Sequence, residues 1–134
     1  MVRLTLLASA CIVSPAAADS IRADASCMPT ATALVFTCEF TLSEGDVPVE
    51  GAAFTIWPGM PSMPMAHKIP HLSAAPTDSP GVYAAEVEAL MPGGWTLTLD
   101  LSAPRRDRIV LPQAFGVAPP DHHTTDHSGH AASD

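Results

Sequence analysis

The sequence has few positively charged residues and no long hydrophobic run. It contains six Lys and Arg residues against 14 Asp and Glu, which gives a formal net charge of −8 at pH 7. A surface this acidic repels nucleic acid and anionic lipid headgroups and suits soluble cations. The apolar run at residues 4–13 is too short to cross a bilayer core of about 30 Å as a helix. We therefore expect no nucleic-acid partner and no membrane span in the mature protein.

The motifs of common catalytic sites are also missing. The sequence has no Gly-x-Ser-x-Gly elbow, no phosphate-binding loop and no His-Glu-x-x-His pattern. No candidate nucleophile has an evident general base near it in the sequence. We therefore predict that the protein is not an enzyme.

The first residues follow the order of a secretory signal peptide. Arg3 precedes the apolar run, Ser14-Pro15 interrupts it, and Ala16-Ala17-Ala18 supplies the small residues that signal peptidase reads. We predict that residues 1–18 are removed and that the protein is exported to the bacterial periplasm. A membrane anchor would need a longer apolar run. A lipoprotein signal ending at Cys11 is a further alternative, but the residues before it lack the usual large aliphatic side chain.

Two cysteines remain after the signal peptide, Cys27 and Cys38. In an oxidising compartment an isolated pair usually forms a disulfide, which here closes a loop of about a dozen residues. The alternative is a pair of thiolate metal ligands. The sequence favours the disulfide, because free thiol pairs rarely persist outside the cytoplasm.

Apolar and polar residues alternate with a period of two, which indicates half-buried β-strands. The two clearest runs flank Met91-Pro92-Gly93-Gly94, and we expect them to form a hairpin. We also expect a last strand to end before Pro112. The expected strands cover residues 21–27, 34–42, 52–57, 83–89, 95–101 and 107–111.

The fourteen prolines are scattered through the chain and exclude long helices. Six or seven short strands with one apolar face each must pack sheet against sheet. We therefore predict an all-β, immunoglobulin-like β-sandwich domain over residues 19–117. The apolar pattern stops near Val117, so residues 118–134 are expected to form a disordered, His-rich tail.

Unusual chemistry lies in residues 57–71, where three methionines occur between prolines and a histidine follows. Thioether sulfur is a soft ligand that favours Cu(I), and imidazole binds both Cu(I) and Cu(II). In an extended segment Met63, Met65 and His67 point to one face, and Met60 needs a turn at Pro61 to join them. These four residues are the candidate Cu(I) ligands, with His71 as an outer candidate.

A simpler interpretation of the same segment exists. Met63 and Met65 could cap the open end of the sandwich as core residues, because Met readily fills irregular gaps. His67 would then be a solvent-facing polar residue.

Four of the six histidines lie near the C-terminus, in a tract that also contains Asp121 and Asp126. Short His-rich tracts bind Cu(II), Zn or Ni without fixed geometry. We interpret this tract as a flexible arm that collects Cu(II), although a solvated chain end or a purification tag would have a similar composition. The histidines are His122, His123, His127 and His130.

The order of three motifs resembles the YtkA-like domain family. They are the run from Gly59 to His67, Gly81-Val82-Tyr83, and Met91-Pro92-Gly93-Gly94-Trp95. The resemblance implies an extracytoplasmic immunoglobulin-like sandwich associated with copper handling and with the assembly of copper-containing oxidases. It also implies that the segment from Met60 to His67 is the Met/His metal segment, and that Met91 approaches the same end. The cysteine pair and the His-rich tail are not part of the pattern.

The leading hypothesis is therefore a periplasmic Cu(I) chaperone or sequestering protein for copper tolerance or cuproenzyme maturation. Its partners would be the copper ion and a periplasmic multicopper or cytochrome oxidase. The alternative is a structural or interaction module without metal, in which residues 58–70, the Met-Pro segment, are an apolar docking patch for a membrane-bound partner.

Overall fold

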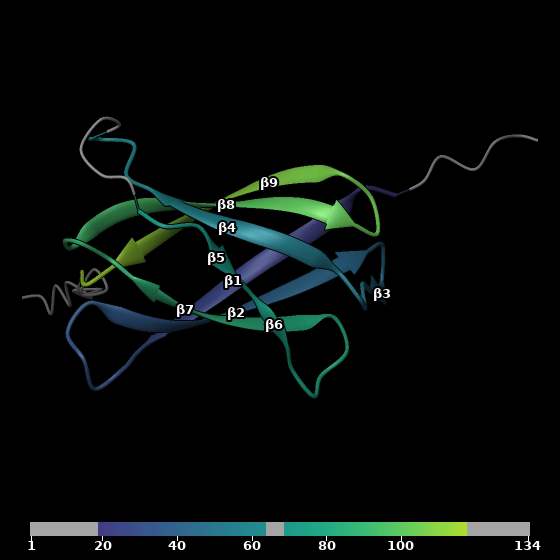
Figure 1. Ribbon diagram of the computed structural model, residues 1–134, viewed down its shortest axis with the longest axis horizontal. Helices are drawn as coiled ribbons and strands as arrows, with labels where there is room; N and C mark the ends of the chain where they lie inside the picture. Colours follow the sequence, from purple (N-terminus) through teal and green to yellow (C-terminus); the bar gives the residue numbers. More distant parts are fainter. Residues whose placement is uncertain (1–18, 64–68, 118–134) are drawn as a thin grey trace, which may run out of the picture.

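The chain folds into two antiparallel sheets that pack face to face (Figure 1). The computed structural model describes residues 19–63 and 69–117. The strands are β1 (Ile21–Pro29), β2 (Val35–Glu44), β3 (Val47–Pro48), β4 (Ala53–Gly59), β5 (Leu72–Ser73), β6 (Ala75–Pro76), β7 (Val82–Glu88), β8 (Gly93–Ala103) and β9 (Asp107–Phe115).

The first sheet has the order β1-β2-β7-β6, with β3 paired to β2, and the second has the order β5-β4-β8-β9. The predicted all-β sandwich is confirmed, and no helix occurs in the part of the chain that the structure describes. The chain has more strands than the six or seven expected, because β3, β5 and β6 are two-residue pieces too short to show a period. Accordingly, within the described ranges no helix is long and apolar enough to cross a membrane.

The core forms where the alternating strands of the two sheets face each other. In β2 every second side chain is buried, and in β8 the same pattern buries Trp95 and the three leucines that follow it at every second position. Phe115 at the end of β9 is fully buried and stacks at a tilt on Phe36 of β2, with ring centroids 4.6 Å apart. Aromatic contacts of this kind join the two layers.

The expected hairpin between residues 83–89 and 95–101 is wrong. β7 lies in the first sheet and β8 in the second, so the connection between them crosses the sandwich. The backbone N–H of Ala89 donates to the Leu34 carbonyl oxygen of the first sheet at 2.8 Å, and Trp95 then enters the core from the second sheet. The apolar faces of the two runs therefore meet across the core.

The last strand also continues further than expected. β9 runs through Pro112 and ends at Phe115. It is an edge strand, paired only with β8, so the missing N–H of a proline can be tolerated there.

A disulfide links Cys27 of β1 to Cys38 of β2. The two residues are direct register partners in the antiparallel pair, with their Cα atoms 4.0 Å apart. Cys38 is fully buried within the core, and Cys27 is partly buried. This bond fastens the edge strand β1 to the centre of its sheet.

Tyr83 of β7 ties the first sheet to the chain that leads into β4. Its hydroxyl donates to the Val49 carbonyl oxygen at 2.7 Å and accepts from the Ala52 backbone N–H at 2.9 Å. Its ring also packs edge-on against Phe54 of the other sheet, at a centroid distance of 5.3 Å. The hydroxyl thus joins β7 to backbone groups 31 and 34 residues earlier in the chain.

Replacing this tyrosine by phenylalanine is expected to lower the free energy of unfolding by about 1–3 kcal/mol. The ring packing remains in Tyr83→Phe, but a buried carbonyl and a backbone N–H lose their partner. Urea unfolding followed by circular dichroism measures the change. An effect below about 0.3 kcal/mol would show that water replaces the hydroxyl without cost.

Candidate functional site

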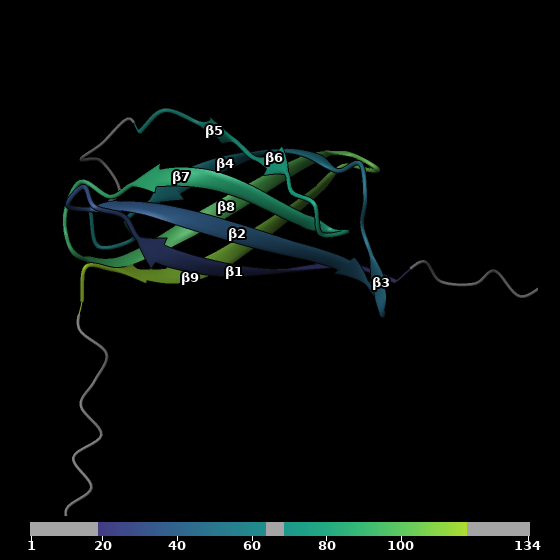
Figure 2. The same ribbon diagram turned by 90° about the horizontal axis from the view of Figure 1, so that it is seen from below.

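Three segments that are distant in the sequence meet at one end of the sandwich. They are the connection after β4, the connection from β7 to β8, and the end of β9 (Figures 1 and 2). A Cβ atom on Gly93 would lie 2.8 Å from Cε of Met60, and one on Gly116 would lie 3.2 Å from Cβ of Pro92. Gly93 is also the register partner of Phe115. We call this end of the molecule the methionine end.

Met60 and Met63 are the first and last residues of a turn. The backbone N–H of Met63 donates to the Met60 carbonyl oxygen at 2.9 Å, with Pro61 in the second position. Proline favours that position because its φ is already suitable. Such a turn brings the two Cα atoms within about 7 Å. The turn at Pro61, which the sequence required for Met60 to approach the candidate ligand Met63, is therefore present.

The two methionines differ in exposure. Met60 is partly buried and packs against the core, with its methyl group over the start of β8. Met63 has 36% of its surface exposed. The interpretation of Met63 as a buried cap does not fit this exposure. One thioether is thus held by the fold, and the second is open to solvent beside it.

A third methionine, Met91, lies in the connection from β7 to β8. It is partly buried against the core, and its carbonyl oxygen accepts a hydrogen bond from the Trp95 indole N–H at 3.1 Å. This bond fixes the backbone of the connection at Met91, two residues before Gly93. The methyl group of Met60 lies over Gly93. Met60 and Met91 therefore belong to the same small region.

Several predicted ligands lie outside the described residues. They are Met65 and His67 in the Met-Pro segment, and the tail histidines His122, His123, His127 and His130. The last described residue, Val117, follows β9 at the methionine end. The predicted signal peptide, residues 1–18, also lies outside the described residues.

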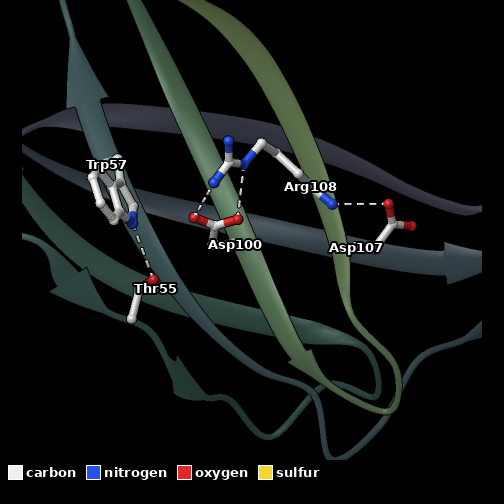
Figure 3. A network of polar contacts seen from close by, with 5 residues as sticks. All are labelled: Thr55, Trp57, Asp100, Asp107 and Arg108. Carbon is white, nitrogen blue, oxygen red and sulfur yellow. Dashed lines mark hydrogen bonds and ion pairs between the residues drawn. The ribbon is translucent and has the colours of Figure 1, made fainter.

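Sequence reasoning missed a stacked pair beside this end. The His71 ring lies on the Trp57 indole with ring centroids 3.4 Å apart and planes inclined by 25°. The indole N–H donates to the Thr55 hydroxyl at 3.2 Å, as Figure 3 shows. In the sequence, Trp57 and His71 lie just outside the two ends of the Met-Pro segment. This spacing becomes informative only once β4 and β5 are known to pair.

Charged residues on the outer face of the second sheet form one bidentate pair. Arg108 of β9 donates two hydrogen bonds to Asp100 of β8, each at 2.9 Å (Figure 3). Hydrogen bonding to this guanidinium lowers the pKa of the Asp100 carboxyl below its usual value. The carboxylate is therefore committed to Arg108 and is not a free metal ligand.

The charges are distributed unevenly along the sandwich. All four described arginines lie at the end opposite the methionines: two lie near strand starts and two in the connection from β8 to β9. Glu86 and Glu88, in contrast, are exposed near the end of β7, next to the methionine end. Because charges beyond about 8 Å are largely screened at physiological ionic strength, a cation at the methionine end would experience the carboxylates more than the arginines.

A shallow groove of about 790 Å³ lies away from this end. Its lining includes Ala53, Ser73, Arg106 and Arg108. The lining also includes the carboxylates of Asp100 and Asp107, of which Asp100 pairs with Arg108. Elsewhere in the described ranges, no group of three or more His, Cys, Asp or Glu side chains converges to hold a metal ion. Met60, Met63 and Met91 are the described residues with thioether sulfur donors at the methionine end.

The fold and the end just described define a small antiparallel β-sandwich that carries a Met-Pro connection beside a Met-Pro-Gly-Gly-Trp turn. The model of the YtkA-like family matches residues 16–100, and the chain belongs to this family. The match ends before β9, which nevertheless completes the second sheet. No curated protein and no solved structure matches the chain.

Proposed function

We propose that this protein is a periplasmic copper-binding protein that holds Cu(I) at the methionine end. Its role would be to deliver the ion to a cuproenzyme, such as a multicopper or cytochrome oxidase, or to sequester it for copper tolerance. The ligands would be Met60, Met63, Met65 and His67, of which the first two are described. The observation that carries the proposal is the turn that joins Met60 to Met63, with the Met60 methyl group over Gly93.

The donor chemistry supports a soft monovalent ion. Thioethers carry no charge and no proton, so they bind soft Cu(I) at any pH and bind hard cations poorly. A site that exposes one thioether and holds the other against the fold can exchange its ion with a partner protein. The nearby carboxylates of Glu86 and Glu88 would raise the local concentration of a cation.

Competitive titration of the full mature chain with Cu(I), under anaerobic conditions and against a chromogenic chelator, tests the proposal. We expect the protein to bind one Cu(I) with a dissociation constant below about 1 μM. This limit corresponds to a binding free energy of about −8 kcal/mol or a more negative value. Zn²⁺ should not compete for this site, because thioether sulfur is a poor ligand for it. If the protein cannot remove Cu(I) from even a weak chelator, the result contradicts the proposal.

The His-rich tail is proposed to act as a separate collector of Cu(II). Deletion of residues 121–134 is expected to lower the number of Cu(II) ions bound while leaving the Cu(I) affinity unchanged within about twofold. Equilibrium dialysis with each oxidation state measures both quantities. A tenfold loss of Cu(I) affinity in the truncated chain would show that the tail supplies ligands to the Cu(I) site.

A docking role without metal remains the second candidate because large apolar side chains are exposed around the methionine end. Trp57, Met63 and Leu90 are exposed by 43%, 36% and 47%. Surface methionines and aromatics suit a partner protein as well as a metal. A chain that binds no Cu(I) but still associates with a membrane-bound partner would favour this function.

A further inference from the structure

The outer face of the second sheet carries a row of exposed apolar side chains. Trp57 of β4 lies opposite Thr98 of β8, and Thr98 lies opposite Val110 of β9. Trp57 and Val110 are 43% and 56% exposed. The His71 ring stacks on the Trp57 indole and extends the row by one more ring. Because residues that are opposite each other in neighbouring strands share a face, the row forms an apolar band across the sheet.

The next row of the same face is polar and lies along the shallow groove. Thr55 lies opposite both Ser73 and Asp100, and Asp100 lies opposite Arg108. The guanidinium of Arg108 holds the Asp100 carboxylate, and Figure 3 shows this pair beside Trp57. The face therefore has an apolar band with a charged, hydrogen-bonding row at its side, the combination that is typical of protein contact surfaces.

The groove on this face has balanced charges. Its charged lining residues are Asp100, Asp107, Arg106 and Arg108. Among the residues that the structure describes, the exposed Arg106 guanidinium makes no ion pair. The Asp107 carboxylate accepts one hydrogen bond, from the Arg108 backbone N–H at 2.8 Å. A surface that offers both signs of charge is complementary to a partner that also offers both, and not to a simple anion or cation.

The outer face of the first sheet differs in charge. On strands β1, β2 and β7 it exposes one arginine, Arg22, and four carboxylates, those of Asp24, Glu39, Glu86 and Glu88. Two copies of this acidic face repel each other, as does most of the surface of a chain with a net charge of −8. Of the two sheet faces, the second is therefore the one that a second copy can cover without bringing unbalanced carboxylates together.

We propose that two copies of this chain associate through the outer faces of their second sheets. In a two-fold arrangement the same patch lies on both sides of the interface, so the patch must be complementary to itself, as a face with equal numbers of acidic and basic groups can be. The apolar rows with Trp57 and Val110 form the centre of the contact. At its border the Arg106 guanidinium of one copy pairs with a groove carboxylate of the other. The association does not depend on copper binding.

The size of the face sets the strength of the association. The second sheet has four strands, and β4 has seven residues, so the face measures about 19 Å by about 23 Å. Its area of about 450 Å² is below the roughly 800 Å² per partner that stable complexes bury. We therefore expect a weak dimer, with a Kd of about 10–100 μM.

Sedimentation velocity of the full mature chain tests the proposal between about 5 μM and about 1 mM, a range that brackets the expected Kd. A metal chelator is present, so that ions cannot bridge two copies. The weight-average mass of wild type should rise from monomer toward dimer. Val110→Glu places a carboxylate in the apolar row of both copies and should weaken the dimer at least about tenfold. Arg106→Glu should weaken it about three- to tenfold, because it replaces attraction at the border by repulsion.

Met28→Glu is the matched control for Val110→Glu. Met28 is 66% exposed on the outer face of the first sheet, so the variant gains the same charge on the opposite side of the sandwich. It should associate like wild type within about twofold, because charges beyond about 8 Å are largely screened at physiological ionic strength. Thermal unfolding verifies that each variant remains folded.

Backbone amide chemical shifts at low and high protein concentration locate the contact. Dimerisation through the second sheet should move the signals of Thr98 and Val110 and leave those of Thr37 and Glu39, on the first sheet, unchanged. A wild-type chain that remains monomeric at about 1 mM would overturn the proposal. Association of Val110→Glu equal to that of wild type, or a loss in Met28→Glu equal to that in Val110→Glu, would overturn it as well.

Discussion

Replacing Met60, Met63, Met65 and His67 together by alanine is expected to weaken Cu(I) binding at least about hundredfold. Even residues that only support a metal ligand commonly contribute about 10- to 100-fold to affinity, so loss of the ligands themselves should exceed that. The anaerobic competition titration measures the change. Met60 also packs over Gly93, so urea unfolding must show that the variant remains folded.

Met28→Ala is the matched control for this prediction. Met28 is 66% exposed and lies on β1, outside the Met-Pro segment. It removes one exposed thioether from β1 of the first sheet, whereas the Met60–Met63 turn follows β4 of the second sheet, and it should leave the Cu(I) affinity unchanged. Equal affinity in the fourfold variant and in wild type would refute these ligands. A loss in Met28→Ala comparable to that of the fourfold variant would instead indicate binding by any exposed methionine.

Phe115→Ala is expected to destabilise the domain by about 3–5 kcal/mol, the usual cost of removing a fully buried phenylalanine. Phe115 is completely inaccessible and contacts Phe36 and Trp95, with ring centroids 4.6 and 6.3 Å apart. The residue belongs to β9, which follows the part of the chain that matches the family model. A large effect would show that β9 is an integral part of the folding unit.

The matched control is Val110→Ala, on the same strand but with an exposed side chain. It should change the free energy of unfolding by less than about 0.5 kcal/mol, as is usual for surface sites. Denaturant unfolding of both variants gives the comparison. A loss of less than 1 kcal/mol in Phe115→Ala would mean that β9 contributes little to the core.

Much of the fold follows from the period-two alternation in the sequence. β2 and β8 bury every second side chain as predicted, because each has one polar and one apolar face. The hairpin prediction failed because alternation identifies a strand but does not show in which sheet its apolar face lies. The connection through Met91 and Pro92 is long enough either to turn back or to cross the sandwich, and in the structure it crosses, so that Trp95 enters the core from the second sheet.

The ends of the strands were less predictable than their centres. A proline interrupts most strands, but Pro112 is tolerated in β9 because an edge strand has a neighbour on one side only. The short strands β5 and β6 contain two residues each, so no pattern could identify them. Their pairing comes from tertiary structure, and it is β5 that positions His71.

The methionine end was predictable in composition but not in arrangement. The spacing of the methionines indicated a soft-metal segment, and the turn at Pro61 followed from the need to join Met60 to Met63. The contact of Met60 with Gly93 could not be foreseen, because it depends on the crossing connection between the sheets. The Trp57–His71 stack was hidden for the same reason: its two residues face each other only when β4 and β5 pair.

X-ray absorption spectroscopy at the copper edge of the protein loaded with one Cu(I) tests the methionine site most directly. Cys27 and Cys38 are joined in a disulfide, so a first shell dominated by sulfur would have to come from methionine thioethers. We predict such a shell in wild type, and its loss in the variant without Met60, Met63, Met65 and His67. A first shell made only of nitrogen and oxygen would contradict copper binding at the methionine end.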